Sequence, residues 1–191
     1  MKNNDTFKKY VAPIIVLVAI CLVISGALAL TYGVTKPIID QRAKADADAA
    51  RQLLLPDADA FTPYEGEMIK TDDGKVKVVE VYTADNGSGM VVTVETKSFG
   101  GALTEMIGID SEGNLTGIVV TKHADTPGVG TKAQTKEHLA QYNGLGELTA
   151  TTAKQDTTIQ AVSGATVSSN AVHYGVYEAL EQYKAMNGGA K

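Results

Sequence analysis

The sequence predicts an α+β protein, in which one N-terminal transmembrane helix is followed by a domain with a twisted antiparallel sheet and packed helices. Three observations predict this class. An apolar run lies near the N-terminus, four short β-rich stretches lie in the middle, and apolar residues recur at helical spacing near the C-terminus. Of the 191 residues, 158 follow residue 33, just beyond the apolar run, which is enough for one globular domain.

The apolar run, Val11 to Leu30, has twenty residues and no charge. At about 1.5 Å per residue it covers the roughly 30 Å hydrocarbon core of a bilayer. Tyr10 and Tyr32 bracket it, as aromatic residues do at membrane interfaces. We therefore expect residues 1–33 to form an N-terminal tail and a membrane anchor.

Two other interpretations of this run stay open. Lysines before it and Ala27-Leu28-Ala29 near its end also fit a cleaved secretory signal peptide, although the run is longer than the usual ~7 to 15 residues. A lipid anchor on Cys21 is disfavoured by the bulky Ile20 before it. Lysine and arginine are nearly balanced on the two sides of the run, so they do not predict its orientation.

Residues 34–60 are expected to form a spacer helix and a linker. Pro37 suits the first position of a helix, Pro56 ends the pattern at about Leu55, and the alanines between them favour helix. Such a helix either holds the domain away from the bilayer or packs on the domain itself.

Residues 61–191 are expected to form the domain. Four β-rich stretches are separated by short turns rich in Gly, Asp and Asn, and connections this short join antiparallel neighbours. The sequence therefore predicts an antiparallel meander with these four strands: Val76 to Tyr82, Met90 to Lys97, Ala102 to Ile109 and Leu115 to Thr121.

Composition excludes several kinds of function. Residues 34–191 contain 14 of the 17 Lys and Arg and 21 of the 22 Asp and Glu, a net charge of −7, which disfavours a nucleic-acid partner. The only cysteine, Cys21, lies in the apolar run, so the domain offers no disulfide, thiolate nucleophile or cysteine-bound metal. The scattered His123, His138 and His173 are interpreted as ordinary histidines, not metal ligands.

The segment His123 to Gly130 follows the fourth predicted strand. Its small residues and Pro127 allow the backbone to approach a flat ligand closely. With Lys132 and Ala133 it also spells the G-x-G-x-x-A dinucleotide motif. A Rossmann site needs a βαβ unit with its glycine turn directly after the strand, so we reject that interpretation.

The C-terminal part predicts a strand, a turn and a helix. Thr157 to Val162 favours a short strand, Gly164 a tight turn, and Thr166 the N-cap of a helix that runs to about Met186 and is closed by Asn187-Gly188-Gly189. A phosphate attached at Thr166 would meet free N–H groups and the positive end of the helix dipole. Alternatively, Thr166 is only a cap.

Together these motifs resemble the G subunit of the Rnf electron-transport complex, and then the related C subunit of the Na+-translocating NADH:quinone reductase. The similarity covers nearly the whole chain, and the motifs occur in the family's order. They are the apolar run, Val94-Glu95-Thr96-Lys97-Ser98-Phe99-Gly100-Gly101, Ile107-Gly108-Ile109-Asp110, the segment His123 to Gly130 and the segment Ser163 to Ser169.

The resemblance implies a covalent flavin. Thr166 is implied to carry FMN as a phosphoester, in a covalent FMN-binding domain. The residues implied to bind the cofactor are the attachment turn Ser163, Gly164 and Ala165, and a loop against the flavin, Asp125, Thr126, Pro127, Gly128 and Val129. Two positions depart from the family pattern, which has an acidic residue at the position of Gln160 and glutamate at that of Asp125.

The resemblance also implies a function. The chain is expected to be an electron-transfer subunit of a membrane-bound ferredoxin:NAD+ oxidoreductase that translocates Na+ or H+, inactive alone on either substrate. Its partners are the other Rnf membrane subunits and, for maturation, a flavin transferase. It is expected in the cell membrane as a single-pass protein with the FMN domain outside the cytoplasm. The alternatives are a covalent-FMN electron carrier for another extracytoplasmic reductase or for an NADH:quinone reductase, and a non-redox anchored binding module.

Overall fold

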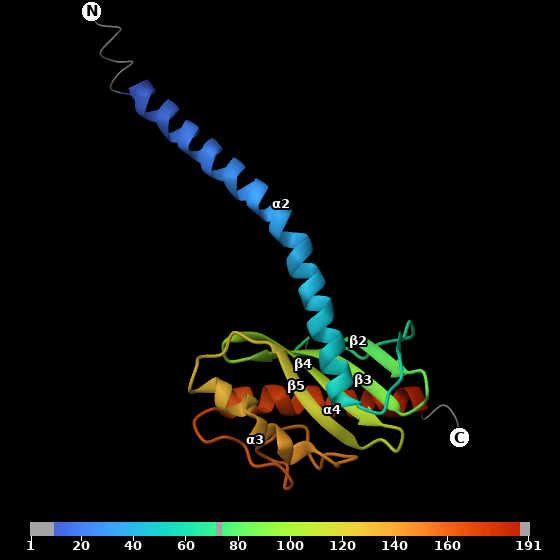
Figure 1. The fold of residues 1–191 in the computed structure, drawn as a ribbon. Helices are drawn as coiled ribbons and strands as arrows, with labels where there is room; N and C mark the ends of the chain where they lie inside the picture. Colours follow the sequence, from blue (N-terminus) through green and yellow to red (C-terminus); the bar gives the residue numbers. More distant parts are fainter. Residues whose placement is uncertain (1–9, 72–73, 188–191) are drawn as a thin grey trace, which may run out of the picture. The chain divides into compact units, whose positions relative to one another are not determined.

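The structure, a computed structural model, describes residues 10–71 and 74–187. The chain divides into two compact units, Met1–Asp46 and Ala47–Lys191. The first contains most of the long helix α2 (Ala12–Leu54), and the second contains the end of that helix and all other elements (Figure 1).

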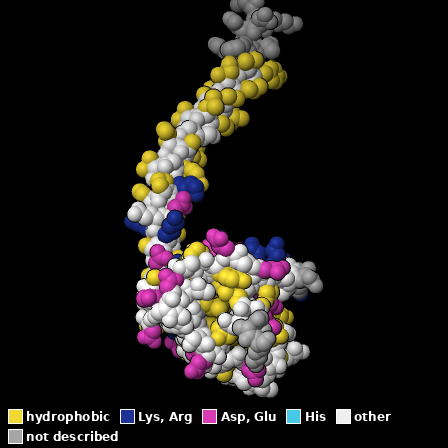
Figure 2. All heavy atoms as spheres, turned by 90° about the vertical axis from the view of Figure 1, so that its right-hand side faces the viewer, with side chains coloured by type: hydrophobic (Ala, Val, Ile, Leu, Met, Phe, Trp, Pro, Cys, Tyr) yellow, Lys and Arg dark blue, Asp and Glu magenta, His cyan; other side chains and the backbone are white. Residues whose placement is uncertain are grey.

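Helix α2 has 43 residues, and its most apolar 18-residue window has a mean hydropathy of 2.9. Within the described ranges it is the one helix long and apolar enough to cross a membrane. Its first part carries hydrophobic side chains, and charged side chains gather further along (Figure 2).

The expected start of a second helix at Pro37 is wrong, because Pro37 lies inside α2. A proline in a helix lacks the N–H that would bond to the carbonyl four residues earlier, a cost of about 3 kcal/mol. The residues just before it, Thr31-Tyr32-Gly33-Val34-Thr35, are poor helix formers, so local propensity does not explain why the helix continues through this position.

The predicted antiparallel meander is confirmed. Each strand pairs with its sequence neighbours in the order β1-β2-β3-β4-β5. One strand was not predicted, since β1 has only three residues and ends in a proline. The strands are β1 (Phe61–Pro63), β2 (Val76–Ala84), β3 (Gly89–Ser98), β4 (Gly101–Asp110) and β5 (Leu115–Lys122).

The sheet buries both of its faces. Helix α4 (Thr166–Asn187) packs through Val172, Val176 and Leu180 against the strand residues of one face, including Val92 and Ile107. A smaller cluster on the other face joins the end of α2 to the sheet; it contains Leu54, Leu55, Ala58, Ala84, Val91 and Met106. The last two turns of α2 therefore pack on the domain. Packing on the domain was one of the two roles expected for this segment.

Three short helices lie between β5 and α4: η2 (Gly130–Gln134), α3 (Lys136–Leu139) and η3 (Ala140–Tyr142). The strand expected over Thr157 to Val162 is wrong, because this segment is irregular. Side chains take the place of a strand partner there. The N–H groups of Thr158, Gln160 and Val162 donate to the side chains of Asp156, Gln141 and Ser169, respectively.

Helix α4 begins at Thr166. The N–H of Ser169 donates to the carbonyl of Ala165 at 2.8 Å, so Ala165 has the N-cap role expected of Thr166, and Thr166 is the first helical residue. The helix ends at Asn187, close to the expected end, and Gly188 and Gly189 lie outside the described residues.

Candidate functional site

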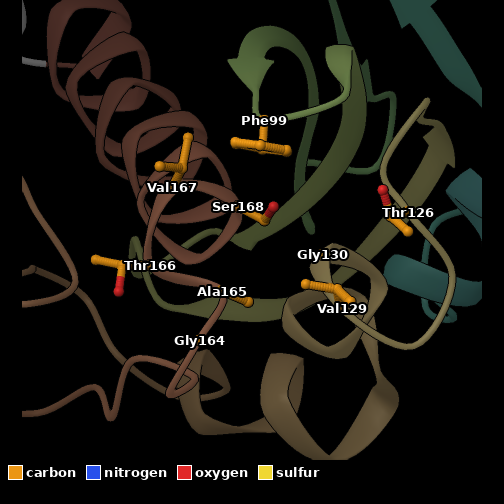
Figure 3. A pocket seen from close by; sticks show the side chains of 9 residues that line it. All are labelled: Phe99, Thr126, Val129, Gly130, Gly164, Ala165, Thr166, Val167 and Ser168. Atoms are coloured by element: carbon orange, nitrogen blue, oxygen red, sulfur yellow. The ribbon is translucent and has the colours of Figure 1, made fainter.

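A cavity of about 310 Å³ lies where three segments meet, the hairpin between β3 and β4, the loop after β5, and the turn that opens α4 (Figure 3). In Figure 3 the loop after β5 faces the start of α4 across the cavity. The lining residues are Phe99 from the hairpin, Thr126, Val129 and Gly130 from the loop, and Gly164, Ala165, Thr166, Val167 and Ser168 from the turn and helix.

The turn before α4 presents Thr166. The N–H of Ala165 donates to the carbonyl of Val162 at 3.0 Å, and Gly164 between them has φ +80°, a left-handed conformation that favours glycine. Helix geometry leaves the N–H groups of Thr166, Val167 and Ser168 without an acceptor inside the helix. An exposed hydroxyl and three N–H donors thus lie together at the positive end of a 22-residue helix.

The loop after β5 is fixed through a buried carboxylate. One oxygen of Asp125 accepts from the Ser98 hydroxyl at 2.5 Å and from Gln134 Nε2 at 2.8 Å. The other accepts from the N–H of Gly100 at 2.8 Å. These bonds join the β3–β4 hairpin, the loop and η2 behind the cavity.

Two glycines let the three segments approach each other. A Cβ at Gly130 would lie 2.8 Å from both the Asp125 carboxyl carbon and the Ser168 hydroxyl, so no larger residue fits between the loop and α4. A Cβ at Gly100 would meet the backbone of Ala124. The geometry of the cavity therefore depends on both glycines.

The structure brings five of the predicted site residues to the cavity and places four elsewhere. Thr126, Val129, Gly164, Ala165 and Thr166 line it. Asp125 is buried behind it, whereas Ser163, Pro127 and Gly128 are exposed and absent from its lining. Sequence reasoning did not assign Phe99, Gly130 and Val167 to the site; an aromatic residue before Gly100-Gly101 in a predicted hairpin was the available signal for Phe99.

The segment leading to the turn at Gly164 is supported by a buried histidine. His173 Nε2 donates to the carbonyl of Ala150 at 2.8 Å, so Nδ1 is the unprotonated nitrogen and accepts from the Tyr142 hydroxyl at 3.2 Å. Burial lowers the pKa of His173. His173 is thus a satisfied core residue, as expected. His138 is buried, with its Nε2 unpartnered among the described residues, and His123 is exposed.

Asp156 organises the same segment. Burial acts to raise the pKa of Asp156, but hydrogen bonds from Thr158, Ala150 and Thr149 lower it to about 2. The carboxylate accepts from the N–H groups of Thr149, Ala150 and Thr158 at 2.7–3.2 Å. It closes the loop that precedes the turn at Gly164.

Comparison with known proteins gives the family. The FMN-binding domain family matches residues 98–181. The G subunit of the ion-translocating oxidoreductase complex of Methanosarcina acetivorans is 33% identical over 186 residues, which cover 95% of this chain and 98% of the relative. The G subunit of the Na+-translocating ferredoxin:NAD+ oxidoreductase complex of Acetobacterium woodii is 31% identical over 194 residues, covering 91% of each.

Among solved structures, the crystal structure of Shewanella oneidensis NqrC is similar with a TM-score of 0.42 and 21% identity, covering 57% of this chain and 62% of that one. The match to FMN-binding domains spans every segment that lines the cavity. The chain belongs to the G-subunit family of ion-translocating oxidoreductase complexes and contains an FMN-binding domain.

Proposed function

We propose that this chain is the electron-transferring G subunit of a membrane-bound, ion-translocating ferredoxin:NAD+ oxidoreductase complex and carries FMN covalently on Thr166. Relatives with this name span almost the whole chain, and its domain belongs to an FMN-binding family. FMN supplies the redox chemistry, because its ring accepts one or two electrons. The chain's own residues fix where the ring lies and what surrounds it.

The observation that carries the attachment is the position of Thr166. Its side chain is exposed, lines the cavity and begins α4, after a turn in which Gly164 has open space where a side chain would be. A phosphoester oxygen on Thr166 meets the N–H groups of the first helical turn and the helix dipole, both of which favour an anion. Formation of this ester would join the Thr166 oxygen to the FMN phosphorus of FAD. The pyrophosphate P–O bond would break, AMP would leave, and the hydroxyl proton would be released, in a step that a flavin transferase would catalyse.

The rest of the cavity suits a flavin. Phe99, Val129 and Val167 provide apolar surface for a ring, and all three are exposed. Thr126 adds one hydroxyl, which can donate to or accept from the ribityl chain. The mixture of apolar side chains with a few polar groups is typical of cofactor sites.

The apolar part of α2 supports a membrane anchor. It is long and apolar enough to span a bilayer, and residues 47–54 at its end pack on the domain. We propose a single span retained in the mature protein, with the FMN domain outside the cytoplasm and the other complex subunits as partners in the membrane. N-terminal sequencing of purified protein tests retention, since a sequence that begins after Ala29 would identify a cleaved signal.

The experiment on function compares the wild-type complex with one that contains Thr166→Ala. Both are purified from membranes through a tag on another subunit and assayed for electron transfer from reduced ferredoxin to NAD+. We expect the variant chain to assemble without flavin and the activity to be lost. Full activity of a complex assembled with the variant would contradict a role for this flavin.

A further inference from the structure

A ring of three hydrogen bonds closes the turn before α4. The hydroxyl of Ser169 accepts from the N–H of Val162 at 3.0 Å, and the N–H of Ser169 donates to the carbonyl of Ala165 at 2.8 Å. The N–H of Ala165 donates in turn to the carbonyl of Val162 at 3.0 Å. Ser169 therefore binds both ends of the turn, and Val162 is held at its N–H and at its carbonyl.

The turn has one buried side and one open side. Ser169 is fully buried and Ala165 is buried, whereas Ser163, Gly164 and Thr166 are exposed. A Cβ at Gly164 would have nothing within 4 Å. The turn is thus fixed to the domain from behind, and the hydroxyl of Thr166 stays open to an approaching enzyme.

The segment before the turn depends on such side-chain bonds for its conformation. Residues 143–165 form no helix or strand, so regular backbone pairing does not restrict them. Ser169 from α4 is one source of restriction. Gln141 from η3 is another, because its Oε1 accepts from the N–H of Gln160 at 2.9 Å. Loss of either acceptor would let the chain that leads to Thr166 sample other conformations.

We propose that Ser169 is a positioning residue for FMN attachment, whose hydroxyl holds the turn in the conformation in which Thr166 reacts. This inference rests on the attachment at Thr166 proposed above, in which the Thr166 oxygen bonds to the FMN phosphorus of FAD and AMP and a proton are released. Because its side chain is fully buried, Ser169 acts through the turn and not by contact with FAD.

A positioning role predicts an effect on the binding of the chain to the transferase. In the wild type the reactive conformation of the turn is already formed. Where the turn forms only part of the time, the apparent affinity falls by the fraction of chains that have it, while chemistry in the bound complex is unchanged. The transferase would then act on the folded domain.

The test measures the kinetics of flavin transfer to the full chain, expressed without a transferase and purified in detergent. Purified flavin transferase and FAD are added, and initial rates of covalent FMN incorporation are measured at several chain concentrations. Ser169→Ala removes the acceptor, and Ser169→Thr keeps it. Gln182→Ala is the matched control, because Gln182 is also buried on α4 and bonds to the backbone of an irregular segment, at Glu67 and Ile69.

We expect Ser169→Ala to raise KM for the chain about fivefold, the factor that one net hydrogen bond gives, and to keep kcat. Ser169→Thr should recover most of the difference, and Gln182→Ala should match the wild type. Gln141→Ala loosens the same segment and should also raise KM, so it provides a second test if denaturant titration shows that Ser169→Ala does not fold.

An unchanged KM in folded Ser169→Ala, or an equal rise in Gln182→Ala, would overturn the inference and leave the attachment intact. A wild-type chain that gains no FMN on Thr166 would overturn both proposals.

Discussion

The carboxyl group of Glu105 on β4 occupies the space that a side chain at Gly175 on α4 would need. A Cβ built at Gly175 collides with Glu105 Oε1 and lies 2.8 Å from Glu105 Cδ and 3.2 Å from Thr96 Cγ2. Glu105 is fully buried, and neither of its oxygens has a hydrogen-bond partner within the described part of the chain. The contact between helix and sheet thus depends on a glycine on one side and a buried acid on the other.

Gly175→Ala should destabilise the domain. In an open helical position this change stabilises by up to about 1 kcal/mol, but here the collision with Glu105 should produce a net loss of about 1–3 kcal/mol. The free energy of unfolding, measured by denaturant titration of the full chain in detergent, tests this. Gly175→Ala should cost less stability when Glu105 is also replaced by alanine. An equal cost of Gly175→Ala with and without Glu105→Ala would contradict the contact.

Glu105→Gln should change how stability depends on pH. Burial raises the pKa of Glu105 well above its ordinary value. The stability that the neutral acid provides is therefore complete below the unfolded pKa of about 4.3, and falls as pH rises from there to the folded pKa, by about 1.4 kcal/mol per pH unit. Unfolding titrations at pH 5, 6, 7 and 8 should show this decline in the wild type and a smaller one in Glu105→Gln. Parallel profiles would show that the acid is not buried in neutral form.

Asp125→Asn should loosen the loop at the cavity. An amide offers one acceptor oxygen where the carboxylate now serves the Ser98 hydroxyl, the Gly100 N–H and Gln134. At least one donor then loses its partner, at a cost of about 1–3 kcal/mol in the free energy of unfolding. The control is Asp85→Asn, which alters an exposed carboxylate bonded to Thr62 and should cost about 0.5 kcal/mol or less. An equal loss of unfolding free energy in the two variants would contradict the role of Asp125 in fixing the loop after β5.

Phe99→Ala should alter the flavin and not the fold. The Phe99 side chain is 77% exposed yet lines the cavity, so its removal costs little stability but takes away apolar surface where we propose that the ring lies. The flavin absorption spectrum of the covalently loaded chain should shift. Gly128→Ala is the comparison, because Gly128 has φ +75° with nothing within 4 Å of a Cβ, and should leave the spectrum unchanged. A shifted spectrum in Gly128→Ala with an unchanged spectrum in Phe99→Ala would instead support the contact between Gly128 and the flavin that the sequence predicts.

The sheet could be predicted from the sequence because β-branched residues and short polar turns mark its strands locally. The same local reasoning failed at Pro37, which lies inside one continuous helix, and at residues 157–162. In that segment Asp156, Gln141 and Ser169 bond to the backbone. Gln141 is 19 residues from Gln160, to which it bonds, and Ser169 is seven residues from Val162, so neither bond follows from the strand-like pattern of the segment itself.

Only part of the lining of the cavity could be predicted from the sequence, and the role of these residues in binding a flavin stays a prediction. The motif at Thr166 and the loop at Thr126 were found, and the structure brings them to one cavity. The lining by Phe99 and the role of Asp125 behind the cavity depend on how a hairpin, a loop and a helix pack together. Such packing is set by Gly100 and Gly130, whose need for close approach appears only in three dimensions.

Covalent attachment at Thr166 is tested most directly by the intact mass of the full chain after expression with and without a flavin transferase. We predict a single increase, equal to one FMN less one water, only with the transferase, and peptide mapping that places it on Thr166. Thr166→Ala should show no increase, and Ser163→Ala should keep it. An FMN adduct on Thr166→Ala, or its mapping to another residue, would contradict the attachment.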